Sequence, residues 1–294
     1  MTVLLPATSL EQTTGEEASI FHRAAYQQRR APATFVLRMT RFIVGFLLIM
    51  ISAPNMAQDS RPAKQRLLVA AASDLRFALD SLIVVFNKEH EGRIDVTYGS
   101  SGKLTEQILN GAPFDIFFSA DLSYPEILRE KNKTASEIFP YAKGHLVLWS
   151  KRMDPSVDGI KMLTNPSVRK IAIANPQHAP YGKRAVECLE FYKLTESTRG
   201  KIVLGDNVSQ TAQFVSTGAA DVGIIALSLA LSPNMKREKG KYFVIPQESY
   251  SPLVQGMVIT SKGKGNSLAG EFFNYIKTDS AAVVLEHFGF LRNF

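Results

Sequence analysis

The stretch 97–104 reads T-Y-G-S-S-G-K-L and joins two segments of different periodicity. Before it, I-D-V-T-Y-G (94–99) alternates as a strand does, and after it K-L-T-E-Q-I-L (103–109) has apolar residues at helical spacing. The start of a helix leaves backbone N–H groups unpaired and carries a partial positive charge. The serine pair therefore has two possible roles, as helix caps or as part of a site that binds an anion.

The same succession of strand and helix recurs from residue 65 onwards. Runs of strand character lie at 67–72, 94–99, 114–119, 145–150, 170–175, 201–205, 220–226 and 253–260. Helical spacing is found at 73–86, 103–109, 124–131, 182–192, 208–217, 268–277 and 280–288. Strands that alternate with helices indicate βαβ units and an α/β fold. Because the loops are short, two lobes would be joined by chain crossings within the fold rather than by a tether.

Four strand-to-helix junctions carry residues suited to an anion. They are A-A-A-S-D-L with Ser73, Y-G-S-S-G-K-L with Ser100 and Ser101, N-P-Q-H-A-P-Y-G-K with Tyr181, and G-D-N-V-S-Q-T with Asn207 and Val208. In an open α/β sheet such junctions lie along one edge, where ligands bind. Each serine alone is explained as an N-cap. Four junctions together, two in each predicted lobe, favour an anion site.

Charge and cysteine content narrow the function classes. The 294 residues have a formal net charge of +7, with Lys and Arg scattered among acids, which argues against a nucleic-acid partner. The nearest approach to a basic run, M-K-R-E-K-G-K (235–241), is interpreted as a solvated loop. The single cysteine, Cys188, lies in a helical pattern and is interpreted as a buried packing thiol. His178 is interpreted as orienting its loop, and Trp149 as packing in the core or at the hinge between the lobes.

The N-terminal region has the order of a secretory signal peptide. L-R-M-T-R precedes ten apolar residues at 42–51, and S-A-P-N-M-A-Q follows them. A membrane span needs about 20 such residues, so an uncleaved anchor is the weaker alternative. We predict cleavage after Ala57 and export from the cytoplasm. Met39 is an alternative start of translation to Met1. Residues 1–57 are not expected to form part of the folded protein.

Several of these segments together resemble the periplasmic molybdate-binding proteins of ABC importers. The similarity is carried by L-L-V-A-A-A-S-D-L, Y-G-S-S-G-K-L-T-E-Q-I-L-N-G-A-P-F-D-I-F-F-S-A-D, I-A-I-A-N-P-Q-H-A-P-Y-G, D-N-V-S-Q-T-A, G-A-A-D-V-G-I-I-A and H-F-G-F. These segments occur in order over about 66–292.

The resemblance implies a two-lobed, type II periplasmic binding protein, with a ligand cleft between lobes joined by two chain crossings. The first lobe would comprise 58–146 and 250–294, and the second lobe 147–249. An N-terminal extension and signal peptide would occupy 1–57.

The resemblance also implies the function. The protein would capture molybdate or tungstate in the periplasm, as a monomer, and deliver it to an inner-membrane ABC permease, without a cofactor, catalysis or nucleic acid. Ser73 and Ser101 would each donate a backbone N–H and a hydroxyl, and Tyr181 and Val208 backbone N–H groups. These four residues would reach the metal only through the oxygens of the bound oxyanion.

One position departs from the family. Some members supply a tyrosine hydroxyl where this chain has Ala226. The hydroxyls of Tyr181, Ser209 and Ser228 are candidates to replace it, with Tyr181 first. Asp74 and Asp206, which flank the predicted donors, are interpreted as complements to a helix start rather than as acceptors of a ligand proton.

Other functions stay as alternatives. A binding protein for sulfate or phosphate would use the same scaffold. A secreted enzyme would need a motif such as G-x-S-x-G, a P-loop or a dinucleotide fingerprint, and none is present in the sequence. The sensor half of a transcription regulator would need a helix-turn-helix before residue 60, where the predicted signal peptide lies.

Overall fold

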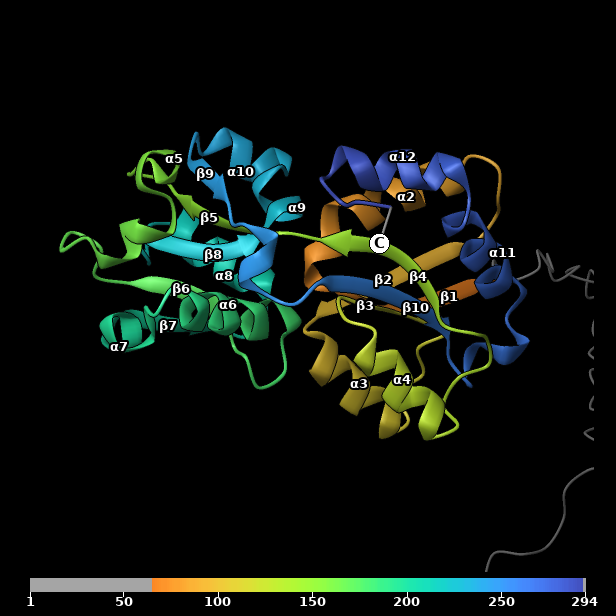
Figure 1. Cartoon of the computed structure of the whole chain (residues 1–294). Helices are drawn as coiled ribbons and strands as arrows, with labels where there is room; N and C mark the ends of the chain where they lie inside the picture. The colour runs from red at the N-terminus through yellow and green to blue at the C-terminus, as the bar shows by residue number, and fades with distance from the viewer. Residues whose placement is uncertain (1–64, 293–294) are drawn as a thin grey trace, which may run out of the picture. The chain divides into compact units, whose positions relative to one another are not determined.

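The computed structural model describes residues 65–292, which contain two five-stranded sheets with helices packed on both (Figure 1). The predicted signal peptide and the alternative start at Met39 lie outside these residues. Within them, no helix is long and apolar enough to cross a membrane.

The first sheet has the strand order β2-β1-β3-β10-β4. Its strands are β1 (Arg66–Ala72), β2 (Arg93–Gly99), β3 (Ile116–Ser119), β4 (Phe139–Gly144) and β10 (Leu253–Ile259). β2, β1 and β3 are parallel, and β10 runs antiparallel between β3 and β4. The antiparallel strand is the return of the chain from the second sheet.

Helices cover both faces of the first sheet. They are η1 (Ser73–Leu75), α2 (Arg76–Phe86), α3 (Ser101–Leu109), α4 (Ser123–Glu130), η5 (Gly263–Gly265), α11 (Ser267–Ile276) and α12 (Asp279–His287). Alternate residues of β1 point to opposite faces: Val69 packs with α2 and α11, and Ala70 packs with α3 and α4. The continuous apolar run at 67–72 is explained by this burial on both faces.

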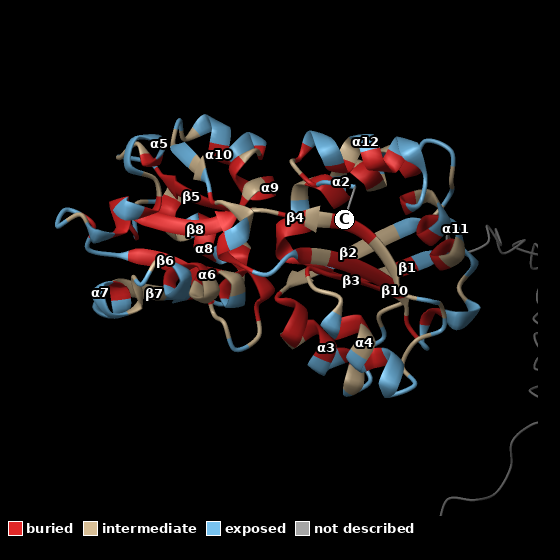
Figure 2. Cartoon of the chain, in the orientation of Figure 1, coloured by how far each residue is buried: buried red, intermediate tan, exposed pale blue. Residues whose placement is uncertain are grey.

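The second sheet has the order β7-β6-β8-β5-β9. Its strands are β5 (Leu146–Ser150), β6 (Ile171–Ala174), β7 (Ile202–Gly205), β8 (Val222–Ala226) and β9 (Lys241–Val244). Around it lie α5 (Pro155–Asp158), η2 (Gly159–Thr164), α6 (Pro180–Phe191), α7 (Thr195–Thr198), η3 (Arg199–Lys201), α8 (Val208–Ser216), α9 (Leu227–Ala230), α10 (Pro233–Arg237) and η4 (Gln247–Ser249). Figure 2 shows the buried residues concentrated on the strands and on the helix faces against them. Trp149 and Cys188 are both buried in this core, as predicted.

The chain passes between the sheets twice. β4 ends at Gly144 and β5 begins at Leu146, so His145 alone connects the two sheets at the first passage. The second passage lies between β9 and β10, and there the Tyr250 hydroxyl accepts a hydrogen bond from the backbone N of Leu146 at 3.1 Å. The predicted α/β fold with two lobes is confirmed. The predicted lobe boundaries at 146 and 249 stay predictions.

Some local predictions were wrong or incomplete. The run 235–241 is not simply a solvated loop, because it begins inside α10, where Met235 is 6% exposed, and reaches the first residue of β9. Ser232 caps α10 with its side chain and Pro233 follows at the first helical position, and these two residues are a helix start signal in the sequence. β4 and β9 were not predicted either. Both are edge strands, and β4 contains Pro140, which breaks the usual strand pattern.

Candidate functional site

The four predicted junctions meet in one small cavity between the two lobes. β1 and β2 end in register at Ala72 and Gly99, so the residues that follow them leave the first sheet side by side. β6 and β7 end in register at Ala174 and Gly205, and α6 and α8 begin shortly after them. We call the cavity the junction pocket. Its lining residues are Ala72, Ser73, Asp74, Gly99, Ser100, Ser101, Ala120, Ala179, Pro180, Tyr181 and Val208.

All four predicted ligand residues line the junction pocket, and their backbone donors are unpaired. Among the residues that the structure describes, the backbone N–H groups of these four residues donate to no other backbone or side-chain group. Three of the four junctions also lack a side-chain cap, and only α8 has one, from Asn207 to the backbone N of Gln210 at 3.0 Å. The alternative that the serines at 73 and 100 serve only as helix caps is therefore wrong.

The hydroxyls of Ser73 and Ser101, the two predicted serine donors, are held in fixed positions. Ser101 is fully buried, and its Oγ accepts a hydrogen bond from the backbone N of Ala120 at 3.0 Å. An Oγ that accepts in this way keeps its own proton for donation. Ser73 Oγ accepts from the backbone N of Ser209 at 3.3 Å, and the Ser209 hydroxyl donates to the backbone O of Ser73 at 2.8 Å. Ser73 is thus placed by contacts from the opposite lobe.

Ala226 ends β8 and is fully buried, so it offers no hydroxyl. The three candidate replacements are all engaged with protein groups. The Ser228 hydroxyl donates to the backbone O of Asp74 at 2.8 Å, and Ser209 contacts Ser73 as described. The Tyr181 hydroxyl accepts from Gln255 Nε2 at 3.3 Å, on the side of the chain crossings. The choice of Tyr181 as the replacement stays a prediction.

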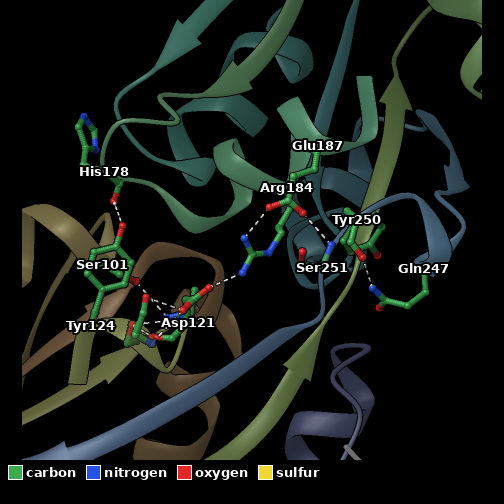
Figure 3. Close-up of polar contacts among 12 residues, drawn as sticks. Ser101, Asp121, Tyr124, His178, Arg184, Glu187, Gln247, Tyr250 and Ser251 are labelled. Carbon is green, nitrogen blue, oxygen red and sulfur yellow. Dashed lines mark hydrogen bonds and ion pairs between the residues drawn. The ribbon is translucent and has the colours of Figure 1, made fainter. Parts of the chain in front are cut away.

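Apart from Asp74, the acidic, basic and histidine side chains near the junction pocket lie around it rather than in its lining. We call the residues Lys103, Asp121, His178, Arg184 and Asp206 the rim. Arg184 pairs with Asp121 of the opposite lobe at 2.5 Å and with Glu187 at 2.8 Å (Figure 3). Lys103 forms an ion pair with Asp206 across the lobes. The interpretation of Asp206 as a complement to a helix start is therefore incomplete, since its carboxylate also pairs with Lys103.

His178 links the lobes mainly through its backbone. Its carbonyl O accepts from the backbone N of Gly102 at 2.9 Å, and its Nδ1 lies 2.8 Å from Ser100 Oγ. A Cβ on Gly102 would lie 2.7 Å from that carbonyl O, so the approach of the two lobes requires glycine here. Burial lowers the pKa of His178, and the neighbouring Lys103 lowers it further. A neutral imidazole at neutral pH follows from both effects.

A second polar cluster near the chain crossings was missed at the sequence level. Gln255 of β10 donates to Asp74 Oδ2 at 2.6 Å, and its Oε1 accepts from the Tyr141 hydroxyl of β4 at 2.7 Å. These residues are 181 and 114 positions apart from Gln255 in sequence, and no local pattern predicts such contacts. The described residues contain no group of His, Cys, Asp and Glu side chains suited to a metal ion.

Comparison with known proteins places this geometry in a family. The model of a family described as "Bacterial extracellular solute-binding protein" matches residues 67–291. The chain belongs to this family. Among the relatives of this solute-binding protein, the molybdate-binding protein ModA of Azotobacter vinelandii is 34% identical over 250 residues, which is 85% of this chain and 98% of the relative.

Two further comparisons define the fold. The solved structure of the Azotobacter vinelandii periplasmic molybdate-binding protein has a TM-score of 0.71 and 32% identity, covering 78% of this chain and all of that one. The sulfate-binding protein SubI of Mycobacterium tuberculosis has a TM-score of 0.64 at 13% identity, covering 77% and 86%, which shows a common fold alone. The prediction of a type II periplasmic binding protein is confirmed.

Proposed function

We propose that this solute-binding protein captures molybdate or tungstate outside the cytoplasm and delivers it to an ABC permease. The observation that carries the proposal is the junction pocket itself. It gathers backbone N–H groups from both lobes, four of them unpaired among the described residues, and the hydroxyls of Ser73 and Ser101 from the first lobe, and no Lys, Arg or His is among its lining residues. Names of relatives support the choice of molybdate, since the Azotobacter vinelandii and Rhodobacter capsulatus proteins, 34% and 31% identical, are both called molybdate-binding protein.

Neutral donors suit a fully ionised tetrahedral oxyanion. Each oxygen accepts hydrogen bonds, and the starts of η1, α3, α6 and α8 add favourable partial charges. Hydrogen bonds to a charged group are worth about 1.5–3 kcal/mol each. Several of them offset the loss of hydration when the lobes enclose the anion.

Entry of the anion requires the lobes to separate. The cavity volume is about 10 Å³ in this structure, which is the space of about one water molecule. Rotation about the two passages between the sheets would widen the pocket, as in hinge closure of other two-lobed binding proteins. The rim ion pairs and the contact between Gly102 and His178 would break on opening and form again on closure.

The remaining parts of the proposal concern location and partners. Membership of an extracellular solute-binding family and the predicted signal peptide both support a periplasmic or extracytoplasmic protein. The proposed partners are the oxyanion and a permease. The protein would act as a monomer, with neither a cofactor nor catalytic activity and without nucleic acid.

A thermal-shift series on the purified protein tests the function, with molybdate, tungstate, sulfate or phosphate added in turn. A ligand at 100 times its Kd stabilises by about 2.7 kcal/mol, or roughly 5–10 °C for a chain of this size. A shift with molybdate and tungstate alone supports the proposal. A shift with sulfate or phosphate instead would make that anion the substrate. The absence of a shift with any of the four anions would contradict oxyanion capture.

A further inference from the structure

Asp74 is a buried carboxyl group in the wall of the junction pocket. It follows Ser73 in the junction between β1 and α2, and 1% of its surface is exposed. Its Oδ2 accepts from Gln255 Nε2 at 2.6 Å. Its Oδ1 is buried and has no hydrogen-bond partner among the described residues. One carboxyl oxygen is therefore held in place, and the other is unpaired in a residue that lines the pocket.

The groups that face Asp74 are neutral. The Oε1 of Gln255 accepts from the Tyr141 hydroxyl, and its Nε2 donates to the Asp74 carboxyl. The Tyr181 hydroxyl of α6 lies beside the same carboxyl, and the Ser228 hydroxyl of α9 bonds the backbone O of Asp74. Burial raises the pKa of both Tyr141 and Tyr181 well above the ordinary range, so neither ionises near neutral pH.

A dianion in this pocket meets an unfavourable charge. Burial raises the pKa of Asp74 to about 6, with the hydrogen bond from Gln255 and the neighbouring Tyr181 hydroxyl acting in the opposite direction, and no cationic side chain of the described residues contributes. At neutral pH the carboxyl is thus mostly ionised without ligand. Two further negative charges in the same low-dielectric cavity would repel it and raise its pKa again.

We propose that Asp74 binds the oxyanion in its neutral, protonated form, so that capture of each dianion takes up a proton. The proton comes from solvent, attaches to Oδ1, and returns to solvent when the anion leaves. The protonated carboxyl is a donor, which adds the hydroxyl that Ala226 does not supply. This inference rests on the proposed function. It names Asp74 as the residue whose protonated carboxyl supplies a further hydrogen-bond donor to the oxyanion.

Titration calorimetry in two buffers of different ionisation enthalpy, with molybdate as ligand at about pH 7.5, measures the proton directly. The wild-type protein is expected to take up close to one proton per anion. Between about pH 6 and pH 8 its affinity should fall about 50-fold, because the ligand-free carboxyl must first be protonated. Asp74→Asn, which is neutral and carries a donor, should bind without proton uptake and with little dependence on pH. Asp80→Asn, which removes an exposed carboxylate of α2, should keep the wild-type uptake.

The outcomes are distinct. Molybdate binding by the wild type without proton uptake overturns the inference and leaves the proposed function intact, and this measurement needs no variant that could fail to fold. The inference is also overturned if Asp74→Asn retains the wild-type pH dependence, which would then belong to another group such as His178. Preferential binding of phosphate that Asp74→Asn abolishes would make Asp74 an acceptor of the ligand's proton, against the proposal. If no oxyanion binds, the proposed function fails and the inference with it.

Discussion

The junction pocket and its rim, a few residues apart, use different chemistry. The pocket presents backbone N–H groups and buried hydroxyls, whereas the rim consists of Lys103, Asp121, His178, Arg184 and Asp206. Neutral donors aimed at one point suit an anion that must also be released. Ion pairs between the lobes suit closure, because they form only when the lobes meet. The difference indicates that ligand recognition and lobe closure are carried by separate sets of residues.

Asp74 is the exception within the pocket, and its replacement should have the largest effect. A buried acid with a raised pKa binds its proton more tightly in the folded than in the unfolded state. Stability therefore falls as the pH rises from about 4, the ordinary pKa, to about 6, and the cost persists above that. Asp74→Asn should raise the free energy of unfolding of the ligand-free protein at pH 7 by about 2–3 kcal/mol. Urea unfolding at about pH 4 and pH 7 checks this. An equal gain at both pH values would contradict it.

Removal of a neutral donor should weaken binding. Ser101→Ala deletes a hydroxyl that has a proton free for the anion, so binding of molybdate should lose about 1.5–3 kcal/mol. The free energy of unfolding should fall by about 1–3 kcal/mol, because the buried backbone N–H of Ala120 loses its acceptor. Ser267→Ala is the matched control, since it removes an exposed serine from the first position of α11. Equal affinities of Ser101→Ala and the wild type would remove Ser101 from the site.

Interference with closure should weaken binding without touching a donor. The Cβ of Gly102→Ala meets the backbone O of His178 in the opposite lobe. Overpacking of this kind costs about 1–3 kcal/mol. The cost applies only when the lobes are closed, because Gly102 and His178 are apart when the lobes are open. We expect weaker molybdate binding at nearly unchanged stability of the ligand-free protein. Gly270→Ala, where no atom lies within 4 Å of the new Cβ, provides the control in calorimetry. A large loss of stability would show that closure is already complete without ligand.

The exposed rim pair should matter least. Lys103 and Asp206 have side chains 45% and 46% exposed, and such pairs contribute about 0–1 kcal/mol. A double-mutant cycle with Lys103→Ala and Asp206→Ala, read as molybdate affinity, should give a coupling energy below about 1 kcal/mol that declines with added salt. A coupling energy as large as the effect of Ser101→Ala would show that ligand recognition and lobe closure are not carried by separate sets of residues.

The sequence predicted those features that local pattern determines. The periodic segments and the Ser, Tyr and Val positions at helix starts follow from residues next to one another in the chain. That these positions line one pocket depended on the rule that strand ends share an edge, and the rule held because β1 pairs with β2 and β6 with β7 in register.

The contacts that place the site could not be predicted in this way. The pairing of Arg184 with Asp121 joins residues 63 positions apart, and the bond from Gln255 to Asp74 spans 181. No local sequence pattern marks Arg184 or Gln255, and both contacts exist only because the chain crosses between lobes. The edge strand β9 was missed for another reason, since none of its four residues is buried and it lacks the apolar run of a buried strand.

The single residue between β4 and β5 has a mechanical consequence. With only His145 between two strands of different sheets, the first crossing has no slack, so the lobes can turn about it but cannot be drawn straight apart. Displacement during a turn grows with distance from the pivot. The cluster of Asp74, Tyr141 and Gln255 lies next to the crossing, where a Cβ on Gly144 would collide with the Tyr181 hydroxyl and approach Gln255 Nε2. His178 and Tyr250 lie on opposite sides of the view in Figure 3. A small rotation would thus separate the outer rim more than the surroundings of Asp74. Gln255 lies in the same lobe as Asp74, so its amide would contact the carboxyl in both positions of the lobes.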